Sequence, residues 1–323
     1  MKHRFLNIAA AVIIITGCGQ KKAEQFQALP FPDVLPPAMM QDAQDRAEYL
    51  ALNTWNKLLD PSRDYPSDST LVSGVRKGDV EQRFANWVQV LDVAGQKTAQ
   101  KSMMKVYEAA FACEKANVSS NLFETMIQLV EKYLYDPNSP IRNEDYYGFF
   151  AERLAVCDGI SSEMKGKYVR DARLCALNRV GTKATDFRFA DRRGKMYTLY
   201  GIKAPYTLLF FSNPGCEACM SIINVLKGEP QISDMIATGQ LAVLNIYIDE
   251  DLDAWRSYMP VYPDEWYNGF DPDFVIRNEE LYNVRAIPSL YLLDSEKIVL
   301  LKDAPENRMF DYLVRIHSGY LNN

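Results

Sequence analysis

The sequence predicts an all-α helical domain followed by an α/β domain with a central mixed sheet flanked by helices, and three observations support this prediction. Between residues 37 and 178, apolar residues recur at helical spacing, and polar turn-forming residues separate the segments. Between residues 179 and 323, short apolar strands alternate with amphipathic helices, which is typical of a sheet covered by helices. The chain of 323 residues is also long enough for about two domains.

The N-terminus has the pattern of a secretory signal. Basic residues at positions 2–4 precede an apolar run at 5–15, and Thr-Gly-Cys follows directly. This junction is similar to a bacterial lipobox, so we expect residues 1–17 to be removed and Cys18 to be lipidated. An ordinary signal peptide with an incidental cysteine is the alternative.

Residues 18–36 are polar and then rich in proline, which predicts an extended, lipid-anchored tether. The expected location is the cell envelope, with the anchor in the outer membrane in preference to the inner and the folded domains facing the periplasm. Since an envelope compartment is oxidising, a reactive dithiol there must be kept reduced by a partner or act as an oxidant.

Composition excludes several classes of function. The net charge of −6 argues against nucleic acid as a partner, because phosphate binding needs a basic face. The chain has two histidines, His3 and His317, so a Ser–His–Asp triad or a multi-histidine metal site is hard to build. A zinc ribbon would need a second cysteine pair. We therefore expect no metal and no cofactor, whereas redox chemistry of sulfur needs neither.

The first domain, residues 37–178, is expected to be a bundle or an array of helical hairpins, because short connections favour antiparallel packing of successive helices. The predicted helices lie at about residues 38–59, 79–94, 97–115, 121–134, 143–156 and 162–177. Their aromatic and methionine stripes are interpreted as core. We find no chemistry in this domain, and binding a partner, shaping a substrate groove and holding a dimer are all open roles for it.

Three cysteines of the helical domain stand apart from one another: Cys113, Cys157 and Cys175. Cys113 shares a stripe with apolar residues and is expected to be a small buried side chain. If a structural disulfide exists here, Cys113–Cys157 is the feasible pair, since both would fall at the same end of an up-down bundle. Connectivity cannot be read from sequence, and one cysteine is left over.

The second domain, residues 179–323, contains two cysteines at the start of a helix. An apolar strand at 206–211 is followed by a turn, then by Cys216 and Cys219, and then by apolar residues at helical spacing. The N-terminus of a helix stabilises a thiolate through its partial positive charge and free N–H groups. Cys216 is therefore the expected nucleophile, and Cys219, one turn later, is placed to resolve a mixed disulfide.

The other predicted elements of this domain complete a mixed sheet. Strands are expected at 184–190, 196–199, 241–248, 289–293 and 298–301, and helices at 231–237, 251–258 and 305–317. The last two strands are joined by a turn and form a hairpin.

Three segments of this domain, FFSNPGCEACM, LAVLNIYIDEDLDAW and VRAIPSLYLLDSEKIVLLKD, resemble the thioredoxin fold in its TlpA-like and AhpC/TSA-like elaboration. The mature chain from residue 37 onward resembles Bacteroidota lipoproteins that join an uncharacterised helical domain to such a thioredoxin-like domain. The resemblance implies a thiol:disulfide oxidoreductase, with Pro288 in a cis peptide bond beside the cysteine pair. It further implies that Ile287 and Pro288 bind the substrate backbone.

The sequence departs from thioredoxin at three positions near the cysteines. Gly215 stands where thioredoxins usually have tryptophan, and Phe210 where thioredoxin has a buried aspartate that moves protons. Glu217 lies between the cysteines, where a carboxylate opposes thiolate formation. A less stabilised thiolate makes the couple more reducing, so we expect a reductant or an isomerase of protein disulfides.

Peroxidase activity and a non-catalytic role are two other functions for a domain of this kind. Peroxiredoxins place a proline and a threonine upstream of the reactive cysteine. Leu209 and Asn213 occupy those positions here, so the peroxiredoxin pattern is absent. A non-catalytic lipoprotein scaffold or binding subunit with a vestigial thioredoxin-like domain remains the alternative, since a fold does not fix a function. The expected partners of an active enzyme are protein disulfides and a membrane redox partner that recycles the pair.

Overall fold

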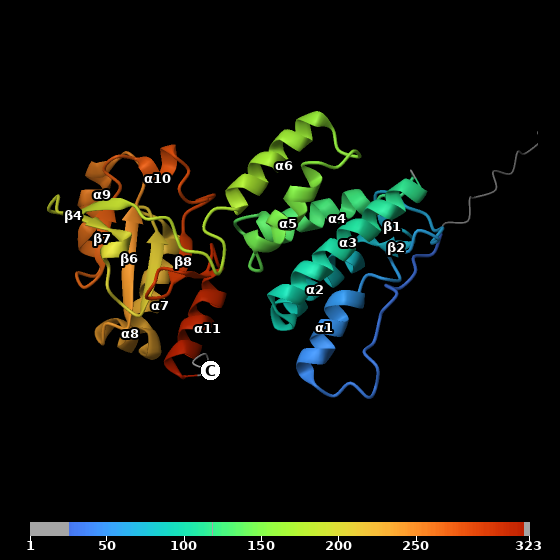
Figure 1. Ribbon diagram of the computed structural model, residues 1–323, viewed down its shortest axis with the longest axis horizontal. Helices are drawn as coiled ribbons and strands as arrows, with labels where there is room; N and C mark the ends of the chain where they lie inside the picture. Colours follow the sequence, from blue (N-terminus) through green and yellow to red (C-terminus); the bar gives the residue numbers. More distant parts are fainter. Residues whose placement is uncertain (1–25, 118, 320–323) are drawn as a thin grey trace, which may run out of the picture.

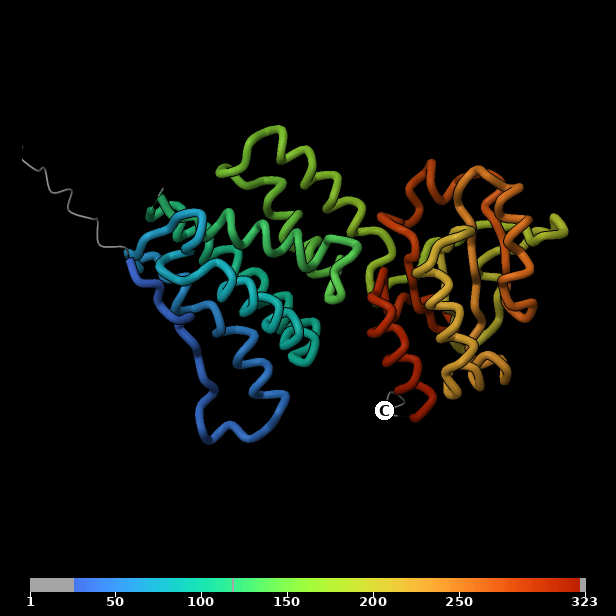
Figure 2. Tube along the Cα trace, turned by 180° about the vertical axis from the view of Figure 1, so that it is seen from behind, coloured from blue at the N-terminus to red at the C-terminus, as the bar shows by residue number. Residues whose placement is uncertain are grey.

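The computed structural model describes residues 26–117 and 119–319, so the expected signal peptide and Cys18 lie outside the described residues. The chain forms a helical part and an α/β part that lie side by side (Figure 1). The first described residues lie at the end of the helical part farthest from the sheet (Figure 2). In the described part of the chain, no helix has the length and apolar character needed to cross a membrane.

The helical part consists of six α-helices, among the described residues, and a short hairpin. The helices are α1 (Ala43–Asn53), α2 (Lys77–Ala94), α3 (Gln96–Ala116), α4 (Leu122–Val130), α5 (Glu144–Leu154) and α6 (Ser162–Cys175). A π-helical turn, Glu131–Tyr135, extends α4, and the hairpin pairs β1 (Leu71–Val72) with β2 (Val75–Arg76). The aromatic centre of the core is a cluster of Trp55, Phe84 and Trp87, whose ring centroids lie 5.5 to 6.1 Å apart.

Three details of this part differ from the sequence prediction. The first helix is shorter than expected, and β1 and β2 occupy a segment that we expected to be an irregular loop. Helix α2 begins at Lys77, before the predicted start at residue 79, and Asp79 in its first turn pairs with Arg76. Asn121, directly before α4, makes no cap hydrogen bond through its side chain, and its Nδ2 group donates to the carbonyl oxygens of Asp68 and Leu71.

The α/β part is built on a seven-stranded sheet with the order β4-β3-β7-β6-β5-β8-β9. The strands are β3 (Arg188–Asp191), β4 (Met196–Thr198), β5 (Tyr206–Phe211), β6 (Leu241–Tyr247), β7 (Tyr267–Phe270), β8 (Ser289–Leu293) and β9 (Val299–Leu301). Strands β5, β6 and β7 are parallel, and the other neighbours are antiparallel. This mixed sheet confirms the predicted fold class.

Helices and irregular segments cover both faces of the sheet. The helices are α7 (Glu217–Gly228), α8 (Pro230–Ala237), α9 (Leu252–Tyr258), α10 (Val275–Asn278) and α11 (Glu306–His317), with 3-10 turns at Leu199–Gly201 and Met259–Val261. One core packs side chains of α7, α8, α9 and α11 against the sheet. The core of the opposite face contains Phe187, Phe211, Ile276 and Tyr291.

Strand β7 was not predicted from the sequence. It is four residues long and contains Asn268 and Gly269, so it has neither the length nor the apolar alternation of a typical strand. It lies between β6 and β3 and thereby joins the β3–β4 hairpin to the rest of the sheet. Gly269 permits a close approach here, because a Cβ atom at this position would lie 2.5 Å from the ring of Phe189.

The two parts have separate hydrophobic cores and meet through polar groups. Every buried member of the helical core lies between Ala47 and Cys175, and every buried member of the two sheet cores lies at Ala184 or beyond. Between them lies a buried ionic cluster with five charged members. They are Arg142, Glu144, Arg285, Lys302 and Asp303.

In this interface cluster, Glu144 is the only acidic member from the helical part. Its Oε1 accepts hydrogen bonds from Arg285 Nε and Asn283 Nδ2, each at 2.8 Å, and its Oε2 lies 2.9 Å from Lys302 Nζ. Arg285 Nη2 also donates to Asp303 Oδ2 at 2.6 Å. The side chains of Glu144 and Lys302 are each 1% exposed, so these charges are sequestered from water and compensate one another.

Candidate active site

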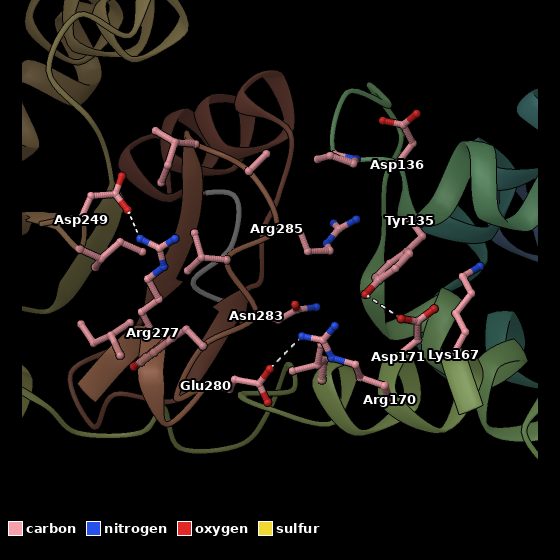
Figure 3. Close-up of a pocket in the computed structure, with 18 of the residues that line it drawn as sticks. Tyr135, Asp136, Lys167, Arg170, Asp171, Asp249, Arg277, Glu280, Asn283 and Arg285 are labelled. Atoms are coloured by element: carbon pink, nitrogen blue, oxygen red, sulfur yellow. Dashed lines mark hydrogen bonds and ion pairs between the residues drawn. The ribbon is translucent and has the colours of Figure 1, made fainter. Parts of the chain in front are cut away.

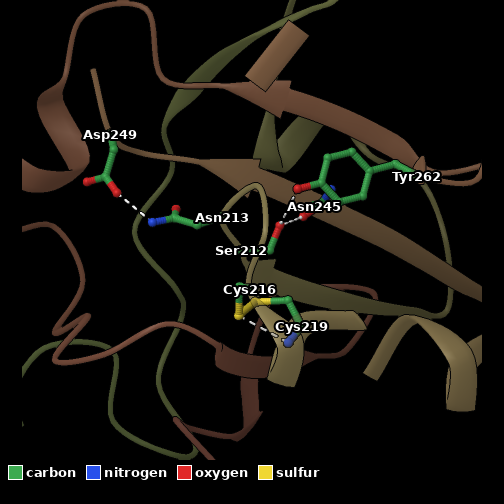
Figure 4. The surroundings of a disulfide bond; sticks show 7 residues. All are labelled: Ser212, Asn213, Cys216, Cys219, Asn245, Asp249 and Tyr262. Carbon is green, nitrogen blue, oxygen red and sulfur yellow. Dashed lines mark hydrogen bonds between the residues drawn. A yellow bond between two sulfur atoms is a disulfide. The ribbon is translucent and has the colours of Figure 1, made fainter. Parts of the chain in front are cut away.

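Cys216 and Cys219 form a disulfide at the end of β5, with their Cα atoms 5.2 Å apart. The chain turns at Gly215, whose φ of 72° lies in the left-handed region that favours glycine. Cys216 is the N-cap of α7, and its Sγ accepts a hydrogen bond from the backbone N–H of Cys219 at 3.1 Å. Both cysteines therefore lie in the strand, turn and helix arrangement that the sequence predicted (Figure 4).

The two cysteines differ in access. Cys216 is partly exposed, whereas Cys219 is buried in the core beneath α7. A group arriving from solvent therefore meets Cys216 first. This asymmetry matches the roles that the sequence suggested for the two residues, which stay predictions.

Ile287 and Pro288 lie next to the cysteine turn. Strand β8 begins at Ser289, which pairs with Phe211, the last residue of β5. The Ile287–Pro288 peptide bond is cis, and both residues are partly exposed. Ile287 and Cys216 pack against the same core. The structure thus brings together four of the five site residues predicted from the sequence, and the fifth, Cys18, lies outside the described residues.

A group of buried polar side chains near the disulfide was not predicted from the sequence. The hydroxyl of Ser212 donates to Asn245 Oδ1 and lies 3.3 Å from the hydroxyl of Tyr262 (Figure 4). Burial raises the pKa of Tyr262, and hydrogen bonds with Ser212 and Asn245 partly oppose the shift. The phenol therefore stays protonated at neutral pH. Asn245 is a polar residue in an otherwise apolar strand, and this feature of the sequence could have indicated a buried polar group here.

Phe210 occupies the position at which thioredoxin has a buried aspartate, so no carboxylate lies at this position. The Phe210 ring is fully buried in the core. Glu217 is exposed in the first turn of α7. On the other side of the turn, Asn213 Nδ2 donates to Asp249 Oδ2 at 2.7 Å, and Asp249 pairs with Arg277. Asp249 is thus connected to the cysteine turn through an amide.

Cys113, Cys157 and Cys175 are buried and carry free thiols in the described structure, so the feasible Cys113–Cys157 disulfide is not formed. Burial raises the pKa of the Cys113 thiol to about 11, and the carboxylate of Asp60 adds to the shift. Burial also raises the pKa of Cys175. Neutral buried thiols are poor nucleophiles, so Cys113 and Cys175 act as apolar core residues. Cys157 is buried in the same helical core.

Across residues 26–117 and 119–319, His, Cys, Asp and Glu form no group of three that could hold a metal ion.

Two comparisons place the chain among known proteins. Residues 16–177 match a family described as a domain of unknown function, DUF5106. A thioredoxin-like protein from Bacteroides caccae is 37% identical to this chain, over 87% of this chain and 98% of its own, and its crystal structure superposes with a TM-score of 0.74. The chain belongs to the DUF5106-containing thioredoxin-like proteins.

Other solved structures match the thioredoxin-like part of this DUF5106-containing chain. The C-terminal domain of an uncharacterised protein from Bacteroides fragilis is 49% identical, over 42% of this chain and 97% of its own, with a TM-score of 0.41. The thioredoxin domain of a thiol-disulfide oxidoreductase from Bacteroides vulgatus is 18% identical, over 42% of this chain and 98% of its own, with a TM-score of 0.36. No curated protein matches the chain.

The family assignment confirms the resemblance drawn from the sequence, both for the thioredoxin-like fold and for an uncharacterised N-terminal domain. In this DUF5106-containing thioredoxin-like protein, the described residues of the helical part contribute no side chain to the disulfide and the polar neighbours named above. Its contribution is at the interface, where Glu144 contacts the segment that leads to Pro288.

Proposed function

We propose that the protein is a membrane-tethered, extracytoplasmic thiol:disulfide oxidoreductase that acts on protein disulfides as a reductant or an isomerase. One observation carries the proposal. A partly exposed Cys216 caps a helix and is bonded to a buried Cys219, and Pro288 directly precedes the neighbouring strand β8. A surface disulfide with a merely structural role needs neither the helix N-terminus nor the adjacent proline segment.

The proposed reaction has two exchange steps. The thiolate of reduced Cys216 attacks one sulfur of a substrate disulfide, forming a mixed disulfide, and the other substrate sulfur leaves as a thiolate that takes up a proton. Cys219 then loses its proton and attacks Cys216 Sγ, which releases the second substrate thiolate. Two electrons pass from the cysteine pair to the substrate, and the Cys216–Cys219 disulfide remains.

The backbone of Ile287 and Pro288 is the proposed substrate contact. Both residues are partly exposed just before the start of β8, so an extended substrate chain can pair with them while its cysteine reaches Cys216. In isomerisation the mixed disulfide is resolved by another cysteine of the substrate. In reduction, Cys219 resolves it, and a dithiol partner in the membrane returns the pair to its reduced form.

The proposed domain organisation follows the sequence. Residues 1–17 form the signal peptide, 18–36 the tether lipidated at Cys18, 37–178 the helical domain and 179–323 the thioredoxin-like domain. The folded domains face the periplasm, and the lipid anchor lies in the outer membrane in preference to the inner membrane. Replacing Cys18 by serine is expected to release the protein from the membrane fraction, and retention of this variant in membranes would exclude the lipid anchor.

An insulin reduction assay tests the proposed activity. The wild-type chain with dithiothreitol is expected to accelerate the precipitation of reduced insulin, and Cys216→Ser is expected to abolish the acceleration. Cys113→Ser, at a buried thiol far from the disulfide, is the matched control and should stay active. If wild type cannot be cycled by dithiothreitol, or if Cys216→Ser matches wild type, the non-catalytic scaffold function replaces the proposal.

A further inference from the structure

A large cavity lies between the helical and thioredoxin-like parts (Figure 3). Its volume is about 790 Å³, within the range of ordinary ligand sites. The helical wall presents Tyr135, Lys167 and Arg170, and the opposite wall presents Asp249, Arg277 and Ile287. Side chains from both parts point into the same space, so neither part contains this cavity alone.

The cavity reaches the candidate active site at two points. Ile287 lines the cavity and directly precedes Pro288, beside the disulfide. Asp249 also lines it and accepts the hydrogen bond from Asn213, three residues before Cys216. A chain bound along Ile287 with one cysteine at Cys216 therefore continues into the space between the two parts.

The segment before Pro288 has backbone groups available for such a chain. Among the described residues, the backbone N–H groups of Arg285 and Ile287, which lie outside the helices and strands, donate no hydrogen bond to another backbone group. Residues two apart in an extended segment direct their backbone groups to the same side, so an extended polypeptide can supply a carbonyl oxygen to each of these two N–H groups.

Contacts between the helical part and the thioredoxin-like part fix the two walls of the cavity relative to each other. Arg285 lies over the ring of Tyr135 at 4.3 Å and is bound to Glu144 on its other side. Arg170 and Arg173 of α6 both pair with Glu280 of the opposite wall. A groove that is formed before binding costs less conformational entropy when a chain is ordered in it.

We infer that this interdomain cavity is the groove that binds the polypeptide segment next to the reacting cysteine of a protein substrate. The helical domain thus completes the substrate site and favours protein disulfides over small disulfides. This inference rests on the proposed function, and it assigns to the helical domain a direct role in recognition. The charged side chains of both signs that line the groove suit a polar, extended segment.

Tryptophan substitutions that fill the groove test the inference in the full chain. Lys167→Trp and Arg170→Trp place bulk at exposed positions of the helical wall, where folding is least at risk. Val169→Trp is the matched control, since Val169 is 57% exposed on the same helix and does not line the cavity.

The readout is kcat/KM for insulin and for bis(2-hydroxyethyl) disulfide, with circular dichroism to verify folding. The two groove-filling variants are expected to lose about tenfold on insulin and to keep wild-type activity on the small disulfide. Val169→Trp should match wild type on both. If the filling variants match Val169→Trp on insulin, or lose both activities in parallel, the groove is refuted while the oxidoreductase proposal stands. A wild-type protein inert toward both disulfides refutes both.

A second measurement does not depend on the filling variants. The Cys219→Ala protein is converted to mixed disulfides at Cys216, with a cysteine-containing peptide or with cysteine alone. Hydrogen exchange of α6 and of residues 284–287 is expected to slow in the peptide adduct relative to the cysteine adduct. Equal exchange in the two adducts would show that the peptide leaves the groove empty and would overturn the inference.

Discussion

Arg285 donates through Nε to the carboxylate of Glu144 at 2.8 Å, which joins the segment before Pro288 to the first turn of α5 in the helical domain. The contact is nearly buried, since the two side chains are 10% and 1% exposed. The position of the proline segment therefore depends on a residue that lies about 140 positions earlier in the chain. The helical domain is a structural part of the candidate active site even though it carries no reactive group.

Removing this carboxylate is expected to destabilise the protein strongly. Glu144→Ala leaves Arg285 and Lys302 buried with one partner fewer, and breaking a buried ion pair in this way costs about 3 to 5 kcal/mol. Urea unfolding measures the change. Glu152→Ala is the control, because the Glu152–Arg179 pair is exposed and is expected to contribute about 1 kcal/mol or less. Similar losses in the two variants would contradict this account of the interface.

The stability of the interface should depend on pH through Asp145. Burial raises the pKa of Asp145, and the Lys302 ammonium opposes this shift with a smaller effect. The folded state thus favours the protonated carboxyl, whose stabilising contribution is present below the unfolded pKa of about 3.9 and is lost as pH rises through the folded pKa. Asp145→Asn should therefore be more stable than wild type at neutral pH.

Urea unfolding at several pH values checks this prediction. The difference between Asp145→Asn and wild type should shrink as the pH falls toward about 3.9, because the wild-type carboxyl becomes neutral as well. A variant that is less stable than wild type at pH 7 would mean that the Asp145 carboxylate is stabilised, not penalised, by its surroundings.

Thiol reactivity should separate Cys216 from the cysteines of the helical domain. After reduction of the native protein, iodoacetamide is expected to modify Cys216 first, because it is partly exposed at a helix N-terminus. Cys113, Cys157 and Cys175 are buried and should react at least about tenfold more slowly. Peptide mass spectrometry gives the order of labelling, and protein unfolded in urea should lose it. Early labelling of Cys113 would contradict the burial described here.

The charge of Glu217 should set part of the reduction potential of the pair. Glu217→Lys replaces a carboxylate next to Cys216 by a cation, which stabilises the thiolate and makes the disulfide a better oxidant. Because the position is exposed, the potential should rise by only roughly 10 to 30 mV. Equilibration with glutathione buffers measures it. Lys227→Glu, in the last turn of the same helix, should leave the potential unchanged, and an equal effect there would exclude a local cause.

Much of the thioredoxin-like part could be predicted from the sequence, because its elements have strong local signals. The apolar run at 206–211, the cysteine spacing and the proline before Ser289 each predicted an element that the structure contains. Strand β7 could not be predicted, since Asn268 and Gly269 suit a loop as well as a strand. Its pairing with β6 and β3 is determined by tertiary contacts, which no local pattern encodes.

The interface cluster was beyond prediction for a related reason. Glu144, Lys302 and Asp303 look like ordinary solvated charges in the sequence, because their partners lie far away along the chain. Asn245 is different. It breaks the apolar pattern of a strand that is otherwise buried, and a buried amide of this kind needs a hydrogen-bond partner. The sequence could have predicted that Asn245 needs a hydrogen-bond partner, but it could not have identified Ser212 as that partner.

The separation of the hydrophobic cores by a polar seam has a consequence for how such a protein is assembled over evolutionary time. A domain that is separated from a partner at an apolar interface exposes a hydrophobic surface and tends to aggregate. Here the exposed groups of either half would be charged side chains such as Glu144 or Arg285, which water solvates readily. Each half thus keeps a hydrophobic core of its own, and a change of neighbour would leave the members of that core unchanged.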